Sequence, residues 1–102
     1  MLQLVKGFMQ PWGLKPELKG VDALECCAAA AAQLQAKGEL WSPYGLTRAY
    51  AKVKGLNHET VWKNMAWALK RAGLPGPAET IRFLAELADF VEATAYRFQG
   101  RL

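Results

Sequence analysis

Cysteine, histidine and long apolar runs are scarce in this sequence, and each shortage excludes a class of protein. Its two cysteines, Cys26 and Cys27, are adjacent, so only a strained vicinal disulfide could join them, and they form no Cys-x-x-Cys pair. The single histidine, His58, cannot complete a zinc site. The longest apolar run has seven residues, far fewer than the ~18 that span a membrane. We therefore expect a cytoplasmic protein with reduced thiols, no metal and no membrane segment.

The composition is that of a globular domain. The chain has 102 residues, of which 52% are hydrophobic and 11% are aromatic. A chain of this length buries enough apolar surface to fold without a metal or a disulfide. Four Trp, four Phe and three Tyr argue against disorder. One folded domain is the expected organisation.

Positive charge is concentrated in one part of the chain, residues 43–73, which we call the basic segment. The net formal charge is +4, but the basic segment holds six basic residues against Glu59 alone, or +5, and the other 71 residues sum to −1. Lysine and arginine gathered in this way are typical of a surface that binds a polyanion such as DNA. The alternative is a solvated helix face.

Helical signals dominate the chain, so we expect an all-α fold of four to five helices. Residues 1–16 contain prolines and glycines among apolar residues and are expected to be an N-terminal arm, with Leu2–Val5 as a candidate short strand. Residues 17–102 then form the helical domain. Glycines, prolines and the Ser42 cap divide this domain into its helices. The expected helices span residues 17–37, 43–54, 58–72 and 78–98.

The basic segment fits the helix-turn-helix pattern at five positions. Ala51 is the small residue at the helix crossing, and Gly55, four residues later, suits a left-handed turn. Leu56 is expected to fill the gap between the helices. Asn57 is expected to cap the second helix, and Val61 to face the first helix. Start and stop signals at both ends of the segment strengthen the prediction, and an ordinary helical hairpin is the alternative.

Double-stranded DNA is the ligand that this motif predicts, because the second helix would enter the major groove. For His58, an exposed turn position is an equal alternative, and Trp62 could equally be core. We expect Trp67 to be core and Met65 to pack where Asn64 interrupts the apolar pattern. The side chains expected to face bases are Asn57, His58, Glu59, Thr60, Trp62 and Lys63. Those expected to contact phosphates are Arg48, Lys52, Lys54 and Lys70.

Three blocks of sequence carry a family resemblance. They are Leu14-Lys15-Pro16-Glu17-Leu18-Lys19-Gly20 with the helix start after it, Leu40-Trp41-Ser42-Pro43 through Ala68, and Gly76-Pro77-Ala78-Glu79-Thr80-Ile81-Arg82-Phe83-Leu84. Together they resemble the C-terminal DNA-binding (effector) domain of the stage zero sporulation response regulator. The resemblance implies a helix-turn-helix fold and a role in transcription regulation during sporulation. The family's recognition helix is rich in arginine, whereas Thr60, Lys63 and Ala66 stand at the matching positions here, so base preference does not carry over. Trp67 likewise stands where the family tends to have histidine.

Catalysis is not expected, because the sequence lacks a glycine-rich phosphate loop, a Ser/His/Asp arrangement and a metal motif. The carboxylates of the last helix are interpreted as a solvated face. No cofactor is expected. The expected partners are double-stranded DNA and a second copy bound through the last helix, whose apolar residues exceed one face, with RNA polymerase as a further candidate. The alternative function is a helical protein–protein interaction module that does not bind DNA.

Overall fold

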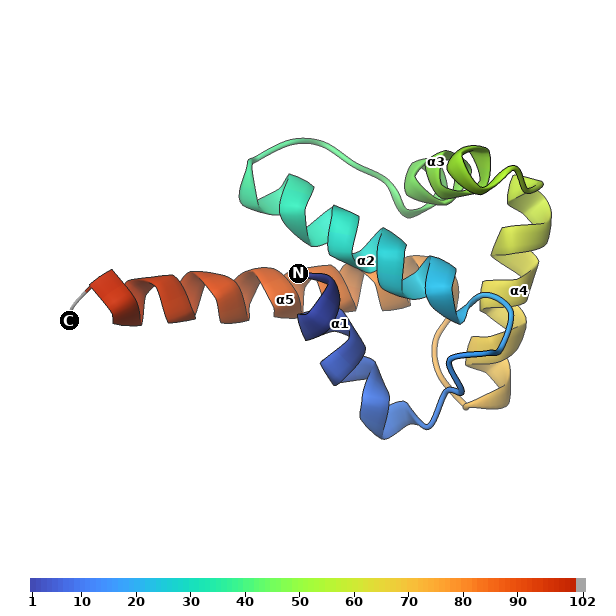
Figure 1. The fold of residues 1–102 in the computed structure, drawn as a ribbon, viewed down its shortest axis with the longest axis horizontal. Helices are drawn as coiled ribbons and strands as arrows, with labels where there is room; N and C mark the ends of the chain where they lie inside the picture. The colour runs from blue at the N-terminus through green and yellow to red at the C-terminus, as the bar shows by residue number, and fades with distance from the viewer. Residues whose placement is uncertain (101–102) are drawn as a thin grey trace.

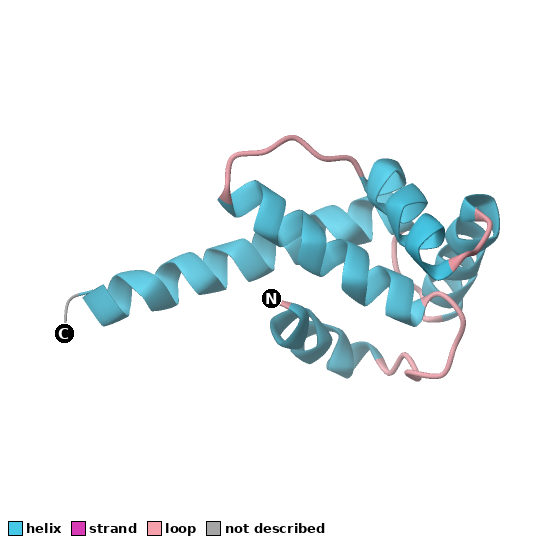
Figure 2. Ribbon diagram, turned by 45° about the horizontal axis from the view of Figure 1, so that its top comes forward, coloured by secondary structure: helices cyan, strands magenta, loops and turns pink. Residues whose placement is uncertain are grey.

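The computed structural model describes the backbone of residues 1–100 and the side chains as far as Ala95. Within this part of the chain every regular element is helical, which confirms the all-α prediction (Figure 2). The elements are α1 (Leu2–Met9), the short 3-10 helix η1 (Gln10–Trp12), α2 (Val21–Ala36), α3 (Pro43–Lys54), α4 (His58–Arg71) and α5 (Pro77–Gly100).

Helix α2 lies at the centre of the molecule, along the first half of α5, with α1 below it and α3 and α4 at one end (Figure 1). Its run of alanines is completely buried at Ala28, Ala31 and Ala32. Small side chains let α5 approach closely, and α5 fills the space with Ile81 and Leu84, both fully buried. The C-terminal half of α5 extends beyond the other helices in the same view.

The N-terminal arm is helical, so the candidate strand at Leu2–Val5 is wrong. Val5 and Met9 are the buried residues of α1. Their i, i+4 spacing gives a helix one apolar face, whereas a half-buried strand would need alternation. Pro11 is tolerated because it stands in the first turn of η1. The arm packs on the rest of the domain, through contacts of α1 with α2 and α5.

Helix α2 begins four residues later than expected, at Val21, because residues 17–20 form turns. Gly20 has a left-handed backbone, with φ 95°, immediately before the helix. A Cβ at Gly20 would lie 2.6 Å from the backbone carbon of Asn64 and 2.6 Å from the backbone nitrogen of Met65. This turn therefore packs directly against the backbone of α4, and only glycine fits the contact.

Helices α3 and α4 have the boundaries that their caps predict. The Ser42 hydroxyl accepts a hydrogen bond from the Gly45 amide, 3.0 Å away, at the start of α3. Gly55 ends α3 with φ 69°. The Asn57 side chain then accepts hydrogen bonds from the amides of Glu59 and Thr60, at 2.9 and 3.2 Å. Local signals therefore fix this helix pair almost residue by residue.

Packing between α3 and α4 follows the prediction at three of its four apolar positions. Ala51, Val61 and Met65 are buried in the common core. Leu56 does not fill the gap as expected, because its side chain is 55% exposed. The Leu56 amide instead donates to the Ala51 carbonyl, 2.8 Å away, which closes the end of α3. The Leu56 side chain stays at the surface, where it lines a hollow.

Candidate nucleic-acid interface

Helix α4 has a buried face and an outer face. Val61, Met65, Ala68 and Leu69 recur at helical spacing and are buried. Positions on the opposite side of the helix are exposed, and all but one of the charges there are positive. The exposed side chains are Glu59, Thr60, Lys63, Trp67, Lys70 and Arg71. The structure thus brings three of the predicted base-facing residues and the predicted phosphate contact Lys70 onto one surface.

Basic residues of α3 adjoin the start of α4. Arg48 and Lys52 border a shallow hollow together with Asn57 and His58. Members of both predicted sets, the phosphate contacts and the base contacts, therefore meet at this point. Lys54 lies elsewhere, because its ammonium is 5.9 Å from the centre of the Tyr50 ring, on another side of α3. The Asn57 amide oxygen is already engaged by the helix cap.

An aromatic cluster joins the first turn of α3 to the first two turns of α4. The Tyr44 ring packs edge-on against His58, with 5.4 Å between ring centres, and against Trp62, with 5.5 Å. His58 and Trp62 are consequently half-buried, and each presents only part of its ring to solvent. Sequence reasoning did not single out Tyr44, because a lone aromatic residue after the proline that begins a helix has no pattern that marks it. The Tyr44 ring holds His58 and Trp62, two of the predicted base-facing side chains, in place.

Trp67 is at the surface, which corrects the expectation that it belongs to the core. Its side chain is 54% exposed. It stands six residues after Val61, whereas the buried positions follow Val61 by four, seven and eight residues, so it lies off the buried face. The Arg71 guanidinium lies 4.7 Å from the centre of its ring, in a cation–π contact. The pair adds an aromatic and a positive charge to the outer face of α4.

Other features of the described residues concern the requirements of a metal site, a membrane span and a reactive thiol. No group of three or more His, Cys, Asp or Glu side chains is placed to hold a metal among them. None of the helices there is both long and apolar enough to cross a membrane. Both cysteines are free, and burial raises the pKa of Cys27 to about 11, which keeps it a protonated thiol at neutral pH.

Comparison with known proteins leaves this surface as the main guide to function. This surface consists of the α3–α4 pair, the exposed outer face of α4 and the adjoining basic side chains of α3. No protein-family model, curated protein or solved structure matches the chain.

Proposed function

We propose that α3 and α4 form a DNA-binding helix-turn-helix, and that the protein is a non-enzymatic, sequence-specific regulator of transcription in the cytoplasm. The observation that carries the proposal is the exposure of basic side chains from both helices beside the outer face of α4. The sequence resemblance to the sporulation effector domain supports the same function. RNA polymerase is then a further partner to test.

The residues divide by position into two roles. Arg48 and Lys52, beside the first turn of α4, are suited to hold phosphates and set the register of the helix in the groove. Glu59, Thr60 and Lys63, on the outer face of α4, are suited to face bases. Asn57, His58 and Trp62 lie at the edge of this surface as flanking base contacts, and Lys70 is a more distant phosphate contact on the outer face of α4. Lys54 lies on another side of α3, so it could reach only a phosphate outside this surface.

Lys52→Ala is expected to weaken binding to every duplex by a similar factor and to make the salt dependence shallower by about one unit of slope, because one phosphate contact is lost. The measurement is fluorescence anisotropy with several unrelated duplexes over a range of salt concentrations. Lys37→Ala is the matched control, since it removes an exposed lysine at the far end of α2.

Three results would argue against this assignment. A loss confined to one duplex sequence would make Lys52 a base contact. An equal loss in the Lys37 variant would mean that total charge, and no particular surface, drives binding. If the wild-type protein binds no duplex at low salt, the DNA proposal fails, and the alternative of a protein-interaction module becomes the better one.

The dimer expected through α5 also has a candidate surface. Ile81 and Leu84 are core, but Phe83 and Phe90 are exposed on the opposite face, with Leu87 half-buried between them. Spacings of four and three residues make the stripe a short coiled-coil seam. If the α5 helices of two copies paired antiparallel with Phe90 at the centre, the Glu86 side chains of the two copies would lie apart. Because one helix-turn-helix reads only a few base pairs, we propose that two copies pair here on adjacent half-sites.

Phe90→Glu is expected to abolish cooperative binding to a duplex long enough for two copies and to leave single-site binding unchanged, because it places like charges at the centre of the pair. Sedimentation with one-site and two-site duplexes measures this. Leu40→Glu is the control, since Leu40 is fully exposed in the loop before α3. Undiminished cooperativity in a folded Phe90 variant would exclude α5 as the dimer contact.

A further inference from the structure

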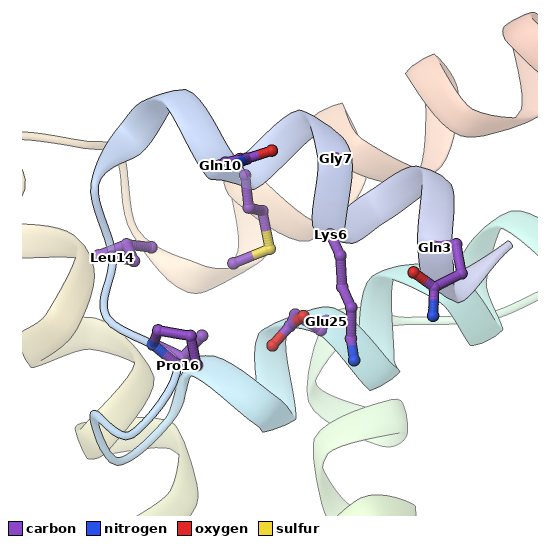
Figure 3. A pocket seen from close by; sticks show the side chains of 9 residues that line it. Gln3, Lys6, Gly7, Gln10, Leu14, Pro16 and Glu25 are labelled. Atoms are coloured by element: carbon purple, nitrogen blue, oxygen red, sulfur yellow. The ribbon is translucent and has the colours of Figure 1, made fainter.

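A hollow of about 560 Å³ lies between α1, the start of α2 and the segment that connects them (Figure 3). It is separate from the basic surface of α3 and α4, none of whose residues line it. Much of its wall is apolar, formed by Met9, Leu14, Pro16 and Val21. Two charged side chains, Lys6 and Glu25, also line it.

The Glu25 carboxylate lacks a protein partner in this hollow. Its side chain is only 9% exposed. None of the side-chain hydrogen bonds among the described residues reaches it. No side-chain oxygen in the described part of the chain is both fully buried and without a hydrogen-bond partner. Because the Glu25 oxygens have no such partner, they are not fully buried, and a molecule in the hollow can contact them. Figure 3 shows the carboxylate turned into the hollow, on the side of Pro16.

Lys6 compensates this charge only in part. It extends from α1 along the same hollow, and in Figure 3 the carboxylate of Glu25 is turned away from its ammonium. The positive charge of Lys6 lowers the pKa of Glu25, but burial has the larger effect and leaves that pKa above its ordinary value. A second cation placed directly on the carboxylate would therefore be stabilised.

We propose that this hollow binds a small primary alkylamine, with its ammonium on Glu25 and its alkyl chain against the apolar wall. A metal ion is a poorer fit, because no cluster of three ligating side chains exists among the described residues. One carboxylate balances the charge of an ammonium, and an alkyl chain of a few carbons suits the wall of Met9, Leu14 and Val21. The inference is independent of DNA binding.

The test is a titration of the protein with butylammonium, followed by the NMR shifts of backbone amides, with 1-butanol and butyrate as uncharged and oppositely charged probes. We expect saturable shifts at the amides that surround the hollow, from butylammonium alone. Glu25→Gln keeps the shape and removes the charge, and it is expected to weaken binding at least fivefold. The variant should fold well, because it removes a charge from a buried position.

Two further variants separate this site from general charge attraction. Glu39→Gln removes an exposed carboxylate in the loop after α2 and is expected to bind like the wild type. Lys6→Met removes the competing ammonium and is expected to bind at least as tightly. The proposal is overturned if butylammonium gives no saturable shifts, if butanol binds equally well, if Glu25→Gln binds unchanged, if Glu39→Gln weakens binding as much as Glu25→Gln, or if Lys6→Met binds more weakly.

Discussion

Val61→Asp is expected to destabilise the domain by several kcal/mol, on the order of 4, which is a large fraction of the stability of a domain of this size. The side chain is 4% exposed and belongs to the core shared by α3, α4 and α2. An aspartate there would bury a charge with no partner, or would push α4 away from α3. The measurement is thermal unfolding followed by far-UV circular dichroism.

Val53→Asp is the matched control for this substitution. Val53 is the same residue type in the neighbouring helix, but it is 84% exposed, so the same chemical change should shift stability by only about 0.5 kcal/mol. If both variants melted like the wild type, the packing of α4 on α3 would be wrong. The proposed DNA-binding surface would then be wrong as well, because that packing aligns the outer face of α4 with the basic side chains of α3.

Gly20→Ala is expected to destabilise the domain by about 2–4 kcal/mol, from two separate causes. A left-handed backbone with φ 95° is strained for any residue that has a Cβ. The new Cβ would also lie 2.6 Å from backbone atoms of α4, which cannot rotate aside as a side chain would. The turn before α2 would have to separate from α4. Urea unfolding measures the loss.

Gly55→Ala separates the two causes. Gly55 is also left-handed, with φ 69°, but nothing lies within 4 Å of the position that its Cβ would take. Only the backbone strain applies there, and about 1 kcal/mol is expected. Equal losses at the two glycines would show that the turn before α2 does not press on α4 as the structure describes.

Local signals predicted much of the fold. Ser42, Gly55 and Asn57 act on residues one to four positions away, so their effect on α3 and α4 can be read from the sequence itself. Helix α1 was missed because Gly7 within it and the prolines and glycine after it suggested a loop, although Val5 and Met9 carried a helical spacing. The late start of α2 was missed because Gly20 packs against Asn64 and Met65 of α4, which lie more than forty residues further along the chain.

The candidate sites also differ in how far the sequence alone predicts them. The basic residues of α3 and α4 are close in sequence, so their concentration was visible before the structure was known. The exposure of Trp67 was also visible in principle, from its spacing to Val61, but its size suggested core. The Tyr44 cluster and the Glu25 hollow had no sequence signal, because each depends on how two helices approach one another.

The pairing of α2 with α5 has a consequence for the order in which the chain folds. These two helices form the centre of the molecule, yet α3 and α4 lie between them in the sequence. Bringing α2 and α5 together closes a long loop, and the entropy of that closure must be lost before their contacts form. Helices α3 and α4 are joined by only three residues and meet without that cost. We therefore expect the α3–α4 hairpin to form early and the α2–α5 pair to set the rate of folding.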